Sequence, residues 1–581
     1  MKVFVCCLFI IANISNNGKA SLESFAPTGA NILFEDTTKN LDKVSCYRPC
    51  KFNVKPKRCH FSLKIEPTIQ EDGRPAITIN GMTPGPPIQA CVNDIIVVEV
   101  QNSILDQDIS IHWHGVEQKG TPYMDGVPMV TQCPIGYGQT FKYAFVATSP
   151  GTFFYHADSV SHQSDGVYGP LIINQPQPLE PHSSLYDYDR SGENTLTIAA
   201  KFPELLTAKL EDVSRLKPDA LIINGDGDIS KIVVMAGFAY RLRLINAIAI
   251  ECPVIVNIEN HEIVVIATDG KSTKPVLARN VELYPGERMD VVVRASQEGG
   301  GFWVKAHGKG VCAGLVANAM LIYSDCFLFE HFNQPAVWES DLVVGGQMLE
   351  SLQDQSHASE VISVYLGIDR NIVKVKEGDI DFRYISDAIP KKPFFPASFA
   401  LQENGVVQIN GKSFLFPNEP ILLRPRDVRA DMFCKVGEEE KQVESQCVQV
   451  LDAVEGDVLE IALVNEGFGS NDSYTFHMHG YNMQVIATWQ NPKDKPISKQ
   501  DFQRNLQNPP VKDTITVPNK GYTIVRIKID RGGTWLLECR SCALSSVPAA
   551  ILIRVPQAIS KAVMDSLPKC GSYRPPDVLL N

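Results

Sequence analysis

The stretch Tyr474-Thr475-Phe476-His477-Met478-His479-Gly480 decides the fold assignment of this 581-residue chain. Its His-x-His-Gly ending occurs again near the other end of the chain, as His112-Trp113-His114-Gly115. Residues two apart in a β-strand point to the same face, so each pair of imidazoles can reach one metal cluster. A single His-x-His is also common in ordinary polar strands, so the other histidines have to be considered with it.

Two more segments carry the same kind of side chain. The first is Gly151-Thr152-Phe153-Phe154-Tyr155-His156-Ala157-Asp158, and the second runs from Trp535 through Glu538-Cys539-Arg540-Ser541-Cys542 to Leu544. Only 12 histidines occur in the chain, and the first three segments hold His112, His114, His156, His477 and His479. Two segments lie near the start and two near the end, which predicts a site between the first and last domains.

The rest of the chain is typical of an all-β protein. Short β-branched runs bounded by Gly, Pro or Asn predict strands at 97–100, 141–146, 232–235, 263–267, 291–294, 448–450 and 523–527. Many short strands with frequent turns indicate sandwiches or barrels. Polar, proline-rich stretches at 175–182 and 332–346 divide the chain into three β domains near 60–175, 185–335 and 350–558, with a tail at 559–581.

The N-terminus predicts a secreted protein. Lys2, the apolar run Val3–Ile14 and small residues at Gly18 and Ala20 make residues 1–20 a signal peptide. We find no later apolar run long enough to span a membrane. The net charge of −12 argues against nucleic acid or an anionic membrane surface as partner. The sequon at Asn471 predicts a glycosylation site.

The cysteine count is odd once the signal is removed. Of 15 cysteines, Cys6 and Cys7 lie in the signal, which leaves thirteen for an oxidising compartment. Cys46, Cys50 and Cys59 indicate a stapled N-terminal extension at 40–60. Setting Cys539 aside leaves twelve, a number consistent with six disulfides.

Four further segments accompany the histidine motifs in a fixed order: Cys46–Cys50, Asn80–Ile88, Tyr240–Asn246 and Pro285–Asp290. With them, the chain from about residue 46 to 556 resembles the multicopper oxidases, specifically their insect laccase-like branch and members that lack copper ligands. The resemblance implies three consecutive cupredoxin-like Greek-key β-sandwich domains. It also implies the family activity, copper-dependent oxidation of phenols or metal ions with reduction of O2 to water.

The resemblance assigns copper ligands residue by residue. It places His112 and His477 at the type-2 copper and His114, His156 and His479 at the type-3 pair. The other three type-3 positions hold Asp158, Glu538 and Arg540. The type-1 positions hold Cys539, which is a vestigial ligand, with Tyr474, Leu544 and Ala549 in place of the two histidines and the axial methionine.

A blue-copper site needs two histidines and a cysteine, and this chain keeps only the cysteine. Because reducing substrates deliver electrons at that copper in the family, we expect an inactive homologue rather than an enzyme. Such a protein would act outside the cell by binding an unknown protein or ligand, or in a structural role. The resemblance identifies no catalytic residue and no certain cofactor.

Two alternatives remain open. The five histidines could hold one residual copper or zinc ion in a metalloprotein or oxidoreductase, unless Arg540 fills the site by pairing with Asp158 or Glu538. Cys539-Arg540-Ser541-Cys542 could serve thiol redox chemistry. That motif normally begins a helix, which lowers a thiol pKa, whereas here a strand and a loop are expected.

Overall fold

The computed structural model describes residues 46–70, 72–208, 217–225, 229–324, 343–352, 361–371, 406–410, 412–434, 446–465, 473–490, 504–542 and 549–570. Within these ranges the protein is almost entirely β-structure, so the all-β prediction is confirmed. The described α-helices are two short ones, α1 (Val160–Ser164) and α2 (Lys561–Ser566). Single 3-10 turns occur at Pro122–Met124, Gln177–Leu179, Leu206–Ala208, Gly310–Cys312, Gly346–Met348 and Ala430–Met432.

The first domain has two four-stranded sheets. One has the order β2 (Pro75–Ile79), β1 (Arg58–Ile69), β4 (Ile95–Asn102), β6 (Thr140–Val146). The other has the order β3 (Ile88–Cys91), β8 (Tyr168–Asn174), β7 (Gly151–Ala157), β5 (Ile111–His114). The sheets face each other, because the buried Trp113 ring of β5 lies 5.0 Å from the Phe145 ring of β6.

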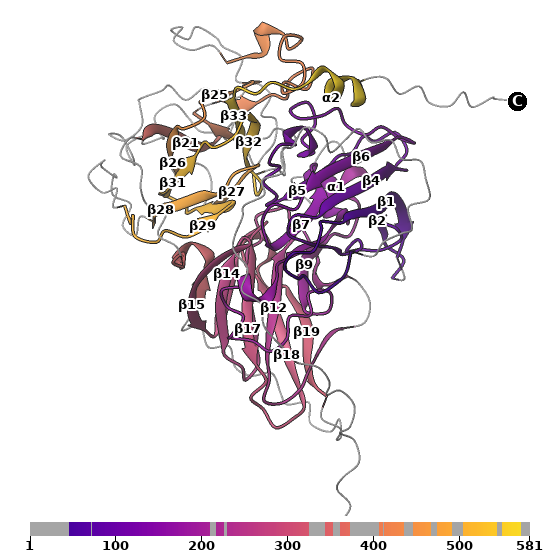
Figure 1. The fold of residues 1–581 in the computed structure, drawn as a ribbon, viewed down its shortest axis with the longest axis vertical. Coiled ribbons are helices and arrows are strands. Elements are labelled where there is room, and N and C mark those ends of the chain that lie inside the picture. Colours follow the sequence, from indigo (N-terminus) through magenta and orange to yellow (C-terminus); the bar gives the residue numbers. More distant parts are fainter. Residues whose placement is uncertain are drawn as a thin grey trace, which may run out of the picture. The chain divides into compact units, whose positions relative to one another are not determined.

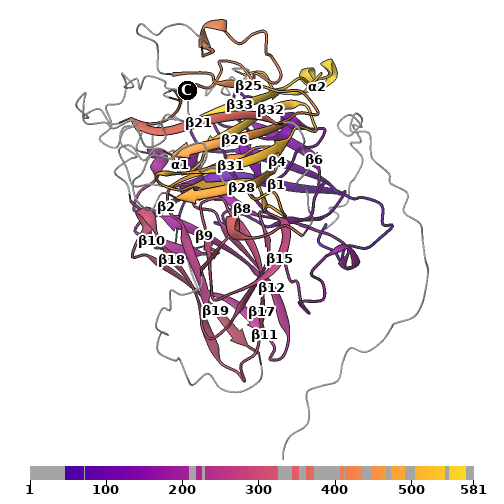
Figure 2. The ribbon, with the colours of Figure 1, turned by 90° about the vertical axis from the view of Figure 1, so that its left-hand side faces the viewer.

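The second domain has two six-stranded sheets, drawn in magenta in Figures 1 and 2. One has the order β10 (Ala220–Ile223), β9 (Thr195–Lys201), β12 (Ala239–Asn246), β17 (Arg288–Arg294), β14 (Ile263–Thr268), β15 (Lys271–Ala278). The other has the order β11 (Ser230–Val234), β19 (Val316–Tyr323), β18 (Gly301–Gly308), β13 (Val254–Ile258), β16 (Asn280–Leu283), β20 (Val343–Gly345). One apolar core joins both sheets, with Leu242 from the first and Val304 from the second fully buried.

The third domain has sheets of six and five strands. The first has the order β22 (Val406–Ile409), β21 (Ile362–Asn371), β26 (Val458–Asn465), β31 (Gly521–Lys528), β28 (Met483–Gln490), β29 (Val511–Lys512). The second has the order β25 (Val450–Asp452), β33 (Ala550–Val555), β32 (Gly533–Cys539), β27 (Tyr474–Met478), β30 (Thr514–Val517). A two-stranded sheet joins β23 (Ser413–Phe414) to β24 (Gln446–Cys447).

The same strand pairing occurs in each domain. A parallel pair joins the first strand of one sheet to a later strand, as in β1 with β4, β9 with β12 and β21 with β26. The other pairs in these three sheets are antiparallel, as in β4 with β6 and β26 with β31. The second sheet of each domain has a parallel pair too, β3 with β8, β11 with β19 and β25 with β33. Three β-sandwiches in succession therefore match the predicted fold class.

The described residues contain six disulfides: Cys46–Cys59, Cys50–Cys91, Cys133–Cys570, Cys252–Cys312, Cys434–Cys447 and Cys539–Cys542. The N-terminal extension is stapled as predicted. The suggestion that Cys539 is the unpaired cysteine is wrong, because its spacing lets it reach Cys542 across a short turn. The thirteenth cysteine, Cys326, lies outside the described residues.

Several predictions also fall outside the described residues: the signal peptide at 1–20, the sequon at Asn471 and the type-1 position Leu544. The exact domain boundaries stay a prediction. Across the described part of the chain, no helix has the length and apolar character needed to cross a membrane.

Candidate metal centre

Strand pairing brings the predicted histidines together. In the first domain, β5 carries His112 and His114, and its register on β7 sets His112 opposite His156. In the third domain, β27 carries His477, followed directly by His479. Figure 1 shows β5 and β7 beside β27 and β32, and His112 Nε2 lies 3.2 Å from His477 Nε2 across the two domains. All five imidazoles are buried.

The hydrogen-bond partners of His112 and His477 fix where their protons are. His112 Nδ1 lies 2.8 Å from the carbonyl oxygen of Asp125, and His477 Nδ1 lies 3.1 Å from that of Asp513. A carbonyl oxygen only accepts, so both Nδ1 atoms carry the proton in the neutral rings. The two Nε2 atoms, 3.2 Å apart, therefore face each other with bare lone pairs.

A second pair of nitrogens behaves in the same way. His156 Nδ1 donates to the carbonyl of Ala157 at 2.7 Å, which leaves its Nε2 bare. The Thr514 hydroxyl donates to Asp513 at 2.8 Å, so it can only accept from His114 Nε2, also at 2.8 Å. His114 Nδ1 is then bare as well, and it lies 3.2 Å from His156 Nε2.

Protonation does not relieve these contacts at neutral pH. Burial lowers the pKa of His112, and it lowers the pKa of His114 and His156 well below the usual range. Burial also lowers the pKa of His477 to about 3. Four neutral imidazoles therefore form two facing pairs of lone pairs, His112 with His477 and His114 with His156, in a site away from water.

His479 has a different environment from the other four. Its Nδ1 lies 2.9 Å from Asp125 Oδ2 and its Nε2 lies 3.3 Å from Glu538 Oε1. Burial opposes its charged form, but Asp125 and then Glu538 outweigh burial and raise the pKa of His479 to about 10. The ring is an imidazolium between two carboxylates, so it has no bare nitrogen for a metal until it loses a proton.

Arg540 points into the site and pairs with Glu538. Its Nη1 lies 2.9 Å from Glu538 Oε1 and 3.1 Å from the backbone carbonyl of Asp158, and its Nη2 donates to Gln163. The 3.4 Å approach of Nη2 to His156 Nδ1 is not a hydrogen bond, because that nitrogen already donates to Ala157. Of the two predicted partners, Arg540 takes the Glu538 carboxylate and not that of Asp158.

One oxygen of the Asp158 carboxyl lacks a hydrogen-bond partner in the described part of the site. This oxygen, Oδ1, is buried. Burial, followed by the charge of Glu538, raises the pKa of Asp158 to about 7. Asp158 therefore carries less negative charge than an ordinary aspartate, and Arg540 is left to balance Glu538.

The predicted type-1 position is packed and bonded. Cys539 ends β32 and is joined to Cys542, and both are buried. Tyr474 and Ala549 are buried in the apolar core of the third domain. As expected from the sequence, Cys539 ends a strand, and residues 540–542 directly after it are not helical. Burial of both sulfurs works against exchange with an external thiol.

Three supporting residues could not be singled out from their sequence context. The carboxylate of Asp125 accepts from His479, and its backbone carbonyl accepts from His112. Asp513 and Thr514 support His114 and His477, because the register of β27 on β30 sets Thr514 opposite His477. In the sequence these two residues are visible only as two adjacent polar residues at the start of a buried strand.

Comparison with known proteins agrees with this arrangement. Three segments, residues 64–178, 182–324 and 415–542, match sequence patterns described as multicopper oxidase. The chain belongs to the multicopper oxidase family. The family part of the predicted resemblance is thus confirmed.

Among the relatives of this multicopper oxidase is Laccase-2 of Botryotinia fuckeliana, 29% identical over 81% of this chain and 77% of its own length. Laccase-1 of Thanatephorus cucumeris is 27% identical over 90% of this chain and 95% of its own. The solved structure of Fet3p, a multicopper oxidase that functions in iron import, matches with a TM-score of 0.70 at 20% identity over 88% and 94%. The laccase of Botrytis aclada gives 0.69 at 23% identity over 88% and 91%. These structures show the fold.

The prediction that this multicopper oxidase is not an enzyme is wrong on this comparison, because the relatives that it matches over most of its length are laccases. The prediction took the missing ligands of the type-1 copper as evidence against any catalysis. Four imidazole nitrogens with free lone pairs nevertheless remain at the other site. The narrower placement in an insect branch stays a prediction, since the relatives named above are fungal.

Proposed function

We propose that this multicopper oxidase is a secreted metalloprotein that holds one ion, copper or zinc, at its surviving histidines and acts as an oxidoreductase when copper occupies the site. His112, His114 and His156, whose ligand atoms lie within 4.8 Å of one another, would be ligands, and His477, which faces His112, would be the fourth candidate. The observation that carries the proposal is the pair of lone-pair contacts at 3.2 Å. Two facing lone pairs in a buried site repel each other, and a cation between them removes that repulsion.

The spacing supports a shared ion. Two nitrogens that bind one tetrahedral ion at about 2.0–2.1 Å lie about 3.3 Å apart, close to the 3.2 Å of each pair. The remaining ring nitrogens donate to protein oxygens, which orients the rings as in established metal–histidine sites. A bound copper ion would supply a one-electron redox couple at this position.

We also propose that the type-1 site is lost. Cys539 is held in a disulfide, so it offers no thiolate, and Tyr474 and Ala549 offer neither an imidazole nor a thioether. A substrate would then have to deliver electrons to the histidine site by another route. Arg540 and Glu538 would act there as a fixed charge pair that replaces two former ligand positions.

Secretion rests on the predicted signal peptide and is supported by the six disulfides, which persist in oxidising compartments. The predicted Asn471 glycan belongs to the same proposal.

An oxidation assay of the natively secreted protein, loaded with copper, tests the proposed activity. We expect oxidation of ferrous iron or a diphenol, lost in a His112→Ala/His477→Ala variant and retained in His60→Ala, which changes an exposed histidine outside the site. Oxidation that persists in the double variant would contradict the assignment to this site. Absence of oxidation in a protein that holds copper would remove the oxidoreductase and leave a binding protein.

A further inference from the structure

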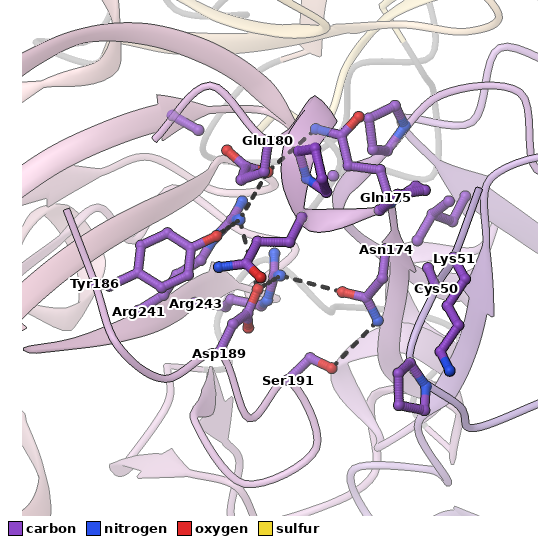
Figure 3. Close-up of a pocket in the computed structure, with 18 of the residues that line it drawn as sticks. Cys50, Lys51, Asn174, Gln175, Glu180, Tyr186, Asp189, Ser191, Arg241 and Arg243 are labelled. Carbon is purple, nitrogen blue, oxygen red and sulfur yellow. Dashed lines mark hydrogen bonds and ion pairs between the residues drawn. The ribbon is translucent and has the colours of Figure 1, made fainter. Parts of the chain in front are cut away.

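A cavity of about 720 Å³ lies between the N-terminal extension, the segment after the first domain and the second domain (Figure 3). We propose that it binds a neutral oligosaccharide. Its volume falls within the roughly 300–1,000 Å³ that is usual for small-molecule sites, which often form where domains meet. None of the five histidines lines it, so this site is separate from the metal centre.

Polar side chains held in fixed positions form one wall. In Figure 3, Arg241 contacts Glu180 and Tyr186, and Arg243 contacts Asp189 and Asn174. Both arginines are buried. Arg241 Nη1 lies 3.1 Å from the Glu180 carboxylate, and Arg243 Nη2 lies 2.7 Å from the Asp189 carboxylate. The guanidinium groups thereby hold carboxylate oxygens in place at the cavity wall.

The arginines of this wall are paired within the protein, and two further charged residues that line the cavity, Lys51 and Asp187, have opposite charges, which argues against an ionic ligand. Arg48 forms a two-contact pair with Asp94, with both distances 2.7 Å. Arg241 and Arg243 share Asp290 in addition to their partners in the cavity. A wall with paired charges offers donors and acceptors side by side but little net charge. Hydroxyl groups both donate and accept, so a polyhydroxylated ligand fits this surface.

Tyr186 leaves one donor unused. Its hydroxyl accepts from Arg241 Nη1 at 3.2 Å, and its own proton goes to no partner among the described residues. Burial raises the pKa of Tyr186 to about 12, so the phenol keeps that proton in neutral solution. A ligand oxygen in the cavity would supply the missing acceptor.

Two aromatic rings stand at the rim. Tyr47 and Phe52 line the cavity and are 68% and 50% exposed. Their segment is fixed by the disulfides Cys46–Cys59 and Cys50–Cys91, so the rings are held beside the polar wall. Exposed flat rings at the mouth of a polar cavity provide apolar faces on which the C–H side of a sugar ring can pack.

Isothermal titration calorimetry of the full secreted protein tests the proposal. The probes are three neutral trisaccharides (maltotriose, cellotriose and triacetylchitotriose), with trigalacturonic acid as the charged comparison. We expect at least one neutral trisaccharide to bind with a Kd of about 1 mM or below. The Tyr47→Ala/Phe52→Ala variant should weaken that binding by about tenfold or more. Tyr186→Phe should weaken it by about threefold or more, because one hydrogen bond is lost.

The matched control is Tyr137→Ala, which removes another partly exposed tyrosine of the first domain away from the cavity and should leave binding unchanged. The proposal is overturned if no neutral trisaccharide binds, if only trigalacturonic acid binds, or if binding survives the Tyr47/Phe52 change. Metal content is a separate measurement, so either proposal can fail alone.

Discussion

The hydroxyl of Thr514 determines where one lone pair of the metal centre points. It gives its proton to Asp513 and so accepts from His114 Nε2, which leaves His114 Nδ1 bare. Loss of such a partner typically lowers metal affinity 10- to 100-fold. The histidines were predictable from the His-x-His spacing, but this threonine was not, because it reaches His114 through tertiary contact between domains.

Thr514→Val should lower the affinity for copper or zinc about 10- to 100-fold, measured by competition with a chelator. It should also lower the free energy of unfolding by about 1–3 kcal/mol, because His114 Nε2–H is left unpaired. The control is Thr516→Val on the same strand, whose hydroxyl has no hydrogen-bond partner among the described residues. Equal effects of the two variants would refute the role given to Thr514.

Arg540 and Glu538 begin a series of ion pairs that continues from Glu538 to His479 and from His479 to Asp125. Arg540→Met should lower the free energy of unfolding by about 3–5 kcal/mol, because it leaves a buried carboxylate in excess. Arg540→Met combined with Glu538→Gln should cost less than Arg540→Met alone, measured by urea unfolding. A double variant that loses as much as the sum of the single ones would argue against this pairing.

At the scale of elements, the strands at 97–100, 141–146, 263–267, 291–294 and 523–527 were predicted and lie in β4, β6, β14, β17 and β31. Alternating β-branched residues between turns carry that information. The prediction at 448–450 was poorer, since only Val450 belongs to a strand, β25. The loop after the first domain also gave no sign that it would hold a buried ion pair, because Arg241 lies far away in sequence.

Glu180, in that loop, makes stability depend on pH. Burial opposes its charge, but His182 and Arg241 outweigh burial and lower the pKa of Glu180 to about 2. A depressed folded-state pKa gives stability that is present above the unfolded value of 4.5 and is lost as pH falls toward 2. Glu180→Gln should therefore cost about 3 kcal/mol at pH 7 and progressively less below pH 4.5. A pH-independent cost in urea unfolding would disprove this linkage.

At the scale of the whole molecule, histidines from opposite ends of the sequence form one centre because the first and third sandwiches contact each other at β5, β7 and β27. The order of the motifs predicted this arrangement. Counting the ligand types in the sequence did not show which of these residues are free to bind a metal. The count could not reveal that Cys539 bonds to Cys542 or that His479 is held as an imidazolium. Contacts between side chains decided both.

The central claim is that the buried histidines hold a metal ion. Elemental analysis of the natively secreted protein, after loading with copper and zinc, tests it most directly. We expect about one ion per chain, without the intense blue absorption of a cysteine-ligated copper. The His112→Ala/His477→Ala variant should lose the ion, and His60→Ala should keep it. Less than about 0.1 ion per chain would contradict the claim, since bare lone pairs in a site of this kind should bind a fitting cation.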